Sequence, residues 1–246
     1  MRQTFIAMGI CCAIGISTLA CQDKSKDYTD PTLPVSERVS SLMSQMTLEE
    51  KVAQMCQYVG LEHMKKAEKD MSAEDLKHSH SQGFYPNLHS SDVEEMTKKG
   101  LISSFLHVVK AEEANYLQSL AQQSRLKIPL LIGIDAIHGN GLYRGSTIYP
   151  TPIGQAATFD PALVERMSRE TAIEMRASGM HWTFTPNVEV ARDARWGRVG
   201  ETFGEDPYLV GQMGAATVRG FQTKDFTGND KVIACAKHLV GGSQPA

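Results

Sequence analysis

The sequence predicts an α/β fold, a partial (β/α)8 barrel of the TIM type with about half of its strands present. Patterns typical of strands and helices alternate from residue 101 to residue 240, and such alternation requires parallel strands joined by helical crossovers. No Gly-x-Gly-x-x-Gly segment opens a helix, which disfavours a doubly wound dinucleotide-binding sheet. About 210 residues remain once a leader and a tether are excluded, fewer than the ~250 of a complete barrel.

Residues 1–20 are predicted to be a signal peptide. Arg2 is the only charged residue before Asp23, and the apolar run between them is too short for a stable bilayer anchor. The four residues that end at Cys21, Thr-Leu-Ala-Cys, resemble a bacterial lipoprotein cleavage site. We therefore expect export to the periplasm or outer membrane with a lipid anchor on Cys21; the alternative is an ordinary cleaved signal that leaves Cys21 unmodified.

Residues 21–34 form the predicted lipidated tether, because they are rich in Asp, Lys, Thr and Pro and show no periodicity. The barrel domain is predicted over residues 35–246, and it starts with a helix over 35–46 in which apolar residues recur at helical spacing. Thr47 and Glu50 form a capping box that starts a second helix. The predicted apolar face of this helix consists of Leu48, Val52, Met55 and Cys56.

Residues 62–88 are polar, contain the breakers Gly83 and Pro86, and are predicted to form a loop. The pair His78 and His80 is of a type that binds metal ions. No Cys or carboxylate is spaced to complete a tetrahedral site, so no metal is predicted.

The regular alternation begins after a second capping box, formed by Ser91 and Glu94. Two later helices share one start signal, an Asp N-cap followed by Pro, at Asp160-Pro161 and Asp206-Pro207. Pro186 weakens the middle of the third strand. The predicted strands cover 101–109, 128–134, 182–190 and 232–236. The predicted helices cover 112–124, 161–178 and 207–220.

Charge and cysteine content exclude several classes of protein. The formal net charge is −3 and becomes −4 when Arg2 is removed with the leader. The basic residues are scattered, so nucleic acid is excluded as a partner. Cys11 and Cys12 belong to the leader, which leaves two cysteines in the domain. These are Cys56 and Cys235, predicted to be buried free thiols because both lie in apolar runs.

Charged side chains follow three of the strand-like runs, at the point where each run ends. The loops after the strands of a barrel share one face, so these charged side chains predict a single polar site. The first such residue is Asp135, whose carboxylate could accept hydrogen bonds from two sugar hydroxyls; a turn or helix cap is the alternative. The neighbouring His138 and Gly139 are predicted to be structural, with Gly139 permitting a turn.

The second group extends from Glu189 to Asp206 and combines arginines, carboxylates and Trp196. So many charges beside a core are tolerable only when they are paired, so we predict internal ion pairs that order a long loop. Trp196 is interpreted either as an apolar wall for a sugar or as an anchor of the loop. The arginines are Arg192, Arg195 and Arg198.

The third group is Lys237-His238. A lysine at a barrel strand end can donate hydrogen bonds to substrate hydroxyls or, when desolvated, act as a Schiff-base nucleophile. The histidine and the surrounding charges favour the charged donor, and an ion pair at the edge of the core is the structural alternative.

Five segments of the chain match the motifs of one known family, in the order in which that family carries them. They are Met46-Thr47-Leu48-Glu49-Glu50-Lys51-Val52, the segment 133–139, the segment 187–198, Gly204-Glu205-Asp206-Pro207 and Lys237-His238. On these motifs, the chain from about residue 34 to residue 242 resembles the N-terminal catalytic domain of glycoside hydrolase family 3, in its β-glucosidase branch.

The resemblance implies an exo-acting, retaining glycoside hydrolase that releases β-linked glucose or related sugars from the non-reducing end, without a cofactor. It implies that Asp135, Arg198, Lys237 and His238 bind the sugar and that Arg195 braces the loop. A retaining glycosidase also needs two carboxyl groups about 5 to 5.5 Å apart. In the family, the nucleophile and the acid/base both follow the Lys-His pair. We therefore expect a truncated domain that has no catalytic residue and is inactive alone.

Three alternatives stay open. A Schiff-base lyase would use Lys237 as its nucleophile, whereas a carbohydrate-binding lipoprotein would hold a sugar without hydrolysing it. A β-N-acetylglucosaminidase of the same family is the third, although its usual Lys-His-Phe-Pro-Gly is replaced here by Lys237-His238-Leu239-Val240-Gly241.

Overall fold

The computed structural model describes residues 27–72, 74, 85, 87–239 and 241–243. The predicted signal peptide, Cys21 and the pair His78 and His80 lie outside the described residues. Within the described part, none of the helices has the length and apolar character needed to cross a membrane. The chain divides into two compact units, Met1–Gln45 and Met46–Ala246.

In the first unit, the described residues form α1 (Val35–Gln45), in agreement with the predicted helix. Arg38 donates from Nε to the carbonyl oxygen of Tyr28 at 2.7 Å, which ties the helix to the segment before it. This contact joins residues close in sequence, so the segment is ordered by local interactions.

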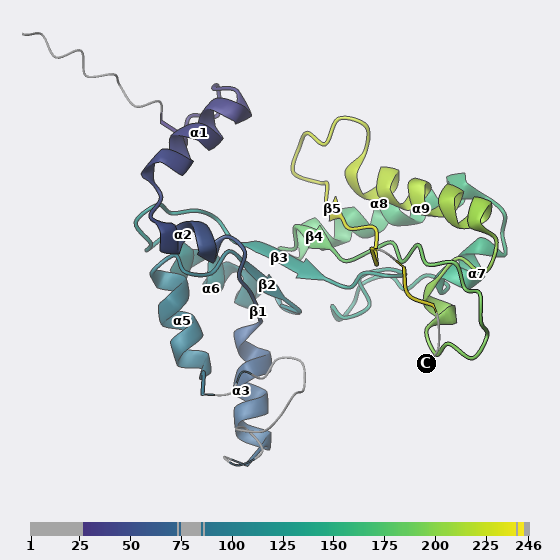
Figure 1. Cartoon of the computed structure of the whole chain (residues 1–246), viewed down its shortest axis with the longest axis horizontal. Helices are drawn as coiled ribbons and strands as arrows, with labels where there is room; N and C mark the ends of the chain where they lie inside the picture. Colours follow the sequence, from purple (N-terminus) through teal and green to yellow (C-terminus); the bar gives the residue numbers. More distant parts are fainter. Residues whose placement is uncertain (1–26, 73, 75–84, 86, 240, 244–246) are drawn as a thin grey trace, which may run out of the picture. The chain divides into compact units, whose positions relative to one another are not determined.

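The second unit is built on a five-stranded parallel sheet with the strand order β1-β2-β3-β4-β5 (Figure 1). Each strand pairs in parallel with the next one along the chain. The sheet is open, with β1 and β5 as its edges. These findings confirm the α/β class and the partial barrel. The strands are β1 (Gln57–Val59), β2 (Ser104–Leu106), β3 (Leu131–Ile134), β4 (Trp182–Thr183) and β5 (Ile233–Ala234).

The helices begin where local capping signals place them. Thr47 Oγ1 accepts from the backbone N–H of Glu50 at 3.2 Å, and Asp160 and Asp206 each accept from the N–H three residues later, at 3.0 and 2.8 Å. These bonds satisfy N–H groups that have no partner inside a helix. The described helices of this unit are α2 (Leu48–Ala53), α3 (Leu61–Asp70), α5 (Ser90–Lys98), α6 (Ala111–Ala121), α7 (Pro152–Ala156), α8 (Pro161–Ala177) and α9 (Pro207–Gln222), with a 3-10 turn at Val199–Glu201.

Two predictions about this early part of the chain are wrong. The polar stretch 62–88, predicted as a loop, begins inside helix α3, because Glu113 on α6 accepts from the backbone N–H of Glu62 at 2.9 Å and so caps α3 from another helix. Helix α5 begins at Ser90 rather than after Ser91, because Asp92 accepts from the backbone N–H of His89 at 2.9 Å. Both starts depend on contacts that periodicity does not reveal.

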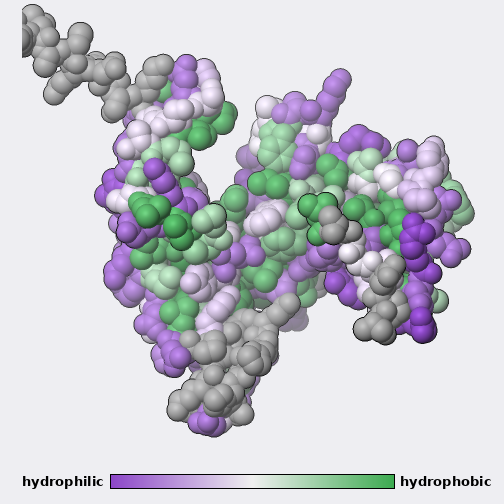
Figure 2. Space-filling view, viewed as in Figure 1, coloured by the Kyte–Doolittle hydropathy of each residue, from purple (hydrophilic) through white to green (hydrophobic). Residues whose placement is uncertain are grey.

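The predicted apolar face of α2 also differs from the structure. Leu48, Val52 and Met55 are 72%, 47% and 79% exposed, and apolar side chains lie at the surface over α2 in Figure 2. Glu50 turns inward instead, since it accepts two hydrogen bonds from Arg125, at 3.1 and 2.5 Å. Cys56 and Cys235, the cysteines of the described part, are free thiols, as predicted. Both are half-buried rather than buried.

The main hydrophobic core lies between the sheet and its helices. Phe105, Ile132 and Ile134 of the central strands are fully buried in it. A second cluster joins α8 to α9 and contains Val164, Val210 and Met213. The two helices approach closely at Gly220, where a Cβ atom would lie 2.4 Å from the carbonyl oxygen of Glu165. Only glycine fits at this crossing.

We predict that Gly220→Ala destabilises the chain, because the added methyl group must push α8 away from α9. The expected loss in free energy of unfolding is about 1–3 kcal/mol, measured by urea denaturation. Gly211→Ala is the matched control in the same helix, since nothing lies within 4 Å of its Cβ position. It should instead gain about 0.5–1 kcal/mol from helix propensity. Equal effects of the two substitutions would contradict this packing.

Candidate functional site

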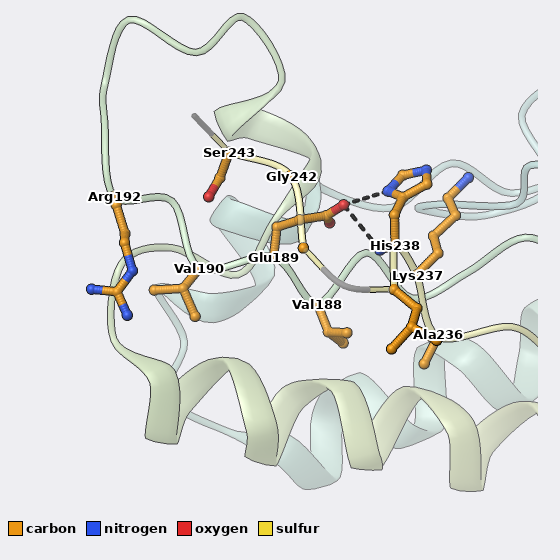
Figure 3. Close-up of a pocket in the computed structure, with 11 residues that line it drawn as sticks. Val188, Glu189, Val190, Arg192, Ala236, Lys237, His238, Gly242 and Ser243 are labelled. Carbon is orange, nitrogen blue, oxygen red and sulfur yellow. Dashed lines mark hydrogen bonds and ion pairs between the residues drawn. The ribbon is translucent and has the colours of Figure 1, made fainter. Parts of the chain in front are cut away.

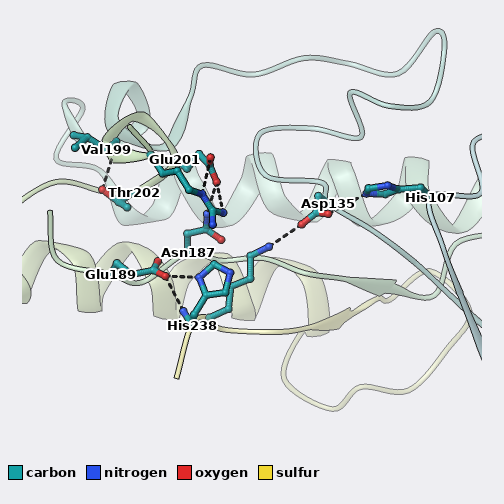
Figure 4. A network of polar contacts seen from close by, with 10 residues as sticks. His107, Asp135, Asn187, Glu189, Val199, Glu201, Thr202 and His238 are labelled. Carbon is teal, nitrogen blue, oxygen red and sulfur yellow. Dashed lines mark hydrogen bonds and ion pairs between the residues drawn. The ribbon is translucent and has the colours of Figure 1, made fainter. Parts of the chain in front are cut away.

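The charged residues that follow the strands lie together at one edge of the sheet. Parallel strands all end at the same edge, and the chain continues beyond β4 and β5 as a paired ladder. Lys237 donates its backbone N–H to the carbonyl oxygen of Pro186 at 2.9 Å, and Val188 donates to the carbonyl oxygen of Lys237 at 2.8 Å. This pairing brings Lys237-His238 beside the segment that carries Glu189 (Figure 4).

Asp135 is held from two sides. Lys237 Nζ lies 2.7 Å from Asp135 Oδ1, and His107 Nε2 lies 3.0 Å from Asp135 Oδ2. Burial by itself raises the pKa of Asp135, but the hydrogen bonds from His107 and Lys237, together with their charges, outweigh it and the pKa lies below its ordinary value. Asp135 is therefore a carboxylate that stays ionised at neutral pH.

Lys237 is mostly buried, with 16% of its side chain exposed, and its ammonium group faces the Asp135 carboxylate. A buried ammonium group is tolerated when it is paired with an opposite charge. This environment favours the charged hydrogen-bond donor over the desolvated neutral amine that a Schiff-base nucleophile requires.

Arg198 is fixed by a two-point contact with Glu201. Its Nε and Nη2 donate to the two carboxylate oxygens at 3.0 and 2.7 Å, and Asn187 Nδ2 donates to Glu201 at 2.9 Å. The hydrogen bond to Glu201 raises the pKa of Arg198, and the charges of Glu201, Glu189 and Asp135 raise it further. Arg198 thus lies within electrostatic reach of the other site carboxylates.

His238 is paired with Glu189. The backbone N–H of His238 donates to Glu189 Oε1 at 3.0 Å, and the ring nitrogen Nδ1 contacts the same oxygen. The side chain of Glu189 is 1% exposed, whereas that of His238 is 44% exposed. The pair therefore consists of an enclosed carboxylate and an imidazole that reaches the surface of a cavity.

This cavity has a volume of about 1050 Å³ and lies where the ends of β4 and β5 continue into loops (Figure 3). Lys237, His238, Glu189 and Arg192 contribute to its lining. Asp135 is linked to it through the ion pair with Lys237. The structure therefore brings the four predicted site residues, Asp135, Arg198, Lys237 and His238, into one charged cluster.

The remaining residues of the predicted motifs brace the loops. Arg195 is 81% exposed and pairs with Asp193 at 2.6 Å, in agreement with the expected bracing role. His138 is a satisfied structural histidine, because its Nδ1 lies 2.9 Å from the carbonyl oxygen of Tyr149. Gly139 has φ = 98°, and a Cβ there would meet the carbonyl oxygen of Thr147 at 2.1 Å, so the turn requires glycine.

Two contacts of the cluster were not predicted: His107 as the partner of Asp135 and Asn187 as the partner of Glu201. The pairing of Arg198 with Glu201 is of the kind predicted for this loop. A signal for His107 was present, since it directly follows β2 as Asp135 follows β3. In the described part of the chain, no group of three or more His, Cys, Asp or Glu residues is arranged to hold a metal ion.

Comparison with known proteins shows similarity to glycosidases. Among curated proteins, the chain is similar to a putative β-xylosidase of Formosa agariphila, 35% identical over 246 residues, with 94% of this chain and 30% of the relative covered. It is 29% identical over 237 residues to a periplasmic β-glucosidase of Salmonella typhimurium, with 93% of this chain and 27% of the relative covered.

Among solved structures, the chain is similar to a β-glucosidase from Listeria innocua in complex with glucose. The TM-score is 0.64 and the identity 33%, with 82% of this chain and 26% of that chain covered. The chain thus spans less than a third of the length of each of these proteins. The family model described as the glycosyl hydrolase family 3 N terminal domain matches residues 47–245, and the chain therefore belongs to glycosyl hydrolase family 3.

Proposed function

We propose that the charged cluster is the subsite that holds the terminal sugar of a β-linked glucoside, or of a related sugar such as a xyloside, in an exo-acting retaining glycosidase. The observation that carries the proposal is the ionised Asp135 held between His107 and Lys237, of which Lys237 lines an open cavity. The glucose complex of the Listeria innocua relative and the β-xylosidase and β-glucosidase names of the curated relatives support this class of ligand.

The cluster has the chemistry that sugar recognition needs. Among the described residues, each oxygen of the Asp135 carboxylate has one protein partner and retains lone pairs for a sugar hydroxyl. Lys237 and His238 line the cavity, and Arg198 lies within electrostatic reach of Asp135, so these three side chains can supply donors. Hydrogen bonds to charged groups are stronger than neutral ones, so a ring with adjacent hydroxyls would bind across Asp135 and Lys237.

Asp135 and Glu201 do not have the properties of the catalytic acid. A general acid must hold a proton near neutral pH, which requires a raised pKa. The hydrogen bond from Arg198 lowers the pKa of Glu201, and that of Asp135 is also lowered. We therefore propose that this chain contributes sugar binding and that the nucleophile and the acid/base are not among the residues of the cluster.

We further propose that the protein is bacterial and exported, with residues 1–20 as its signal peptide and lipid on Cys21. The periplasmic β-glucosidase from Salmonella typhimurium supports export of this chain. The lipid anchor is supported by the sequence around Cys21.

Sugar binding should depend on Asp135. We predict that Asp135→Ala weakens binding of glucono-δ-lactone to the 246-residue chain about 10- to 150-fold, as expected for the loss of hydrogen bonds to a charged group. Isothermal titration calorimetry measures the change. Asp225→Ala is the control, because Asp225 is an exposed partner of Lys231. The same affinity in both variants would reject Asp135 as a sugar ligand.

Acid should remove the stabilisation that Asp135 provides. Its lowered pKa means that this contribution is complete above the ordinary value of 3.8 and is lost as the pH falls through the lower value of the folded state. We therefore predict that the stability difference between the unmodified chain and Asp135→Asn shrinks as the pH is lowered below 3.8. Urea unfolding at a series of acidic pH values measures it. A difference that grows with acid would contradict the assignment.

The 246-residue chain should not hydrolyse an aryl β-glucoside above a blank. The reason is that Asp135 and Glu201 are held as ionised partners of Lys237 and Arg198, so neither supplies a protonated acid. Release of the aryl alcohol, followed by absorbance, is the measurement. Turnover that disappears in Asp135→Ala would show that the cluster itself performs catalysis.

A further inference from the structure

Glu189 is the most enclosed charged side chain of the cluster, and the sugar-binding proposal gives it no role. Its side chain is 1% exposed, and Gly242 lies beside it, since a Cβ at Gly242 would be in van der Waals contact with Oε1 at 3.6 Å. A carboxylate buried to this extent is costly unless it is paired. Within the described residues, both of its hydrogen bonds go to His238.

We propose that Glu189 is a positioning residue that fixes the protonation pattern and orientation of the His238 ring. Glu189 Oε1 accepts from the backbone N–H of His238 and faces the ring nitrogen Nδ1, so the proton of the ring is held on Nδ1. The opposite nitrogen, Nε2, is then the atom that meets a ligand. The effect of Glu189 on sugar binding rests on the proposed function, whereas its effect on the His238 ring does not.

The geometry excludes direct contact between Glu189 and a sugar as the simpler explanation. Glu189 contributes to the cavity lining, yet almost none of its side chain is exposed, whereas 44% of the His238 side chain is. The second carboxylate oxygen, Oε2, is buried and has no partner in the described part of the chain. Glu189 therefore acts on a ligand through His238.

The register of the segments after β4 and β5 explains why Glu189 and His238 meet. The ladder between the segments after β4 and β5 pairs Asn187 with Lys237, which sets Glu189 two residues and His238 one residue further along these neighbouring segments. Both hydrogen bonds converge on one oxygen. In Glu189→Gln, the amide oxygen can take the place of Oε1 and accept both hydrogen bonds. The amide nitrogen then takes the place of Oε2, which has no partner among the described residues.

The test uses the 246-residue chain with 15N-labelled histidine. Long-range 1H–15N spectra at alkaline pH report which ring nitrogen carries the proton, and His238→Gln assigns the signal. We expect an Nδ1-protonated His238 in the unmodified chain and in Glu189→Gln. In Glu189→Met, which keeps the length but removes the acceptor, the proton should move to Nε2, the form that free histidine favours in water. An unchanged ring proton in Glu189→Met would overturn the proposal.

Affinity for glucono-δ-lactone is the second readout. We expect about a tenfold loss in Glu189→Met and near-complete retention in Glu189→Gln, with Glu165→Gln on the surface of α8 as the control. A moved ring proton with unchanged affinity would overturn the link to binding. If the unmodified chain binds no sugar, the proposed function fails, while the spectra still decide the role of Glu189. Urea midpoints show whether each variant is folded. If Glu189→Met does not fold, a ring proton on Nε2 in Glu189→Gln would overturn the proposal.

Discussion

The ion pair between Asp135 and Lys237 is the contact on which the candidate site depends. It joins residues 102 positions apart, one after β3 and one after β5, across the end of the strand between them. The pair exists only because all of these strands run in parallel and end at the same edge. It also lets two charges remain beside a hydrophobic core, since each offsets the desolvation of the other.

The same principle extends through the cluster. Three of the four proposed sugar ligands have a partner outside that set: Asp135 has His107, Arg198 has Glu201, and His238 has Glu189. The fourth, Lys237, pairs with Asp135. A binding site needs side chains that are held in position before the ligand arrives, because ordering them during binding reduces affinity. The loop from residue 191 to residue 204 contains two arginine–carboxylate contacts, Arg195 with Asp193 and Arg198 with Glu201.

Local signals made much of this structure predictable. The starts of α8 and α9 are predictable because each depends only on local residues: the side chain of Asp160 or Asp206 accepts from the backbone N–H three residues later. The start of α3 was missed because its cap, Glu113, lies 51 residues away, and β1 was missed because it is short and gains its bonds from β2. Asp135, Lys237 and His238 were predicted from their places after strands and Arg198 from the family motif, but their partners required the register of neighbouring segments.

A crystal structure of the 246-residue chain with glucono-δ-lactone or glucose would show whether the charged cluster binds a sugar. We expect one sugar ring in the cavity, with hydroxyls within hydrogen-bond distance of Asp135 and Lys237 and with His238 Nε2 directed at the ring. A sugar bound elsewhere on the chain, with these side chains still paired only to each other, would contradict it.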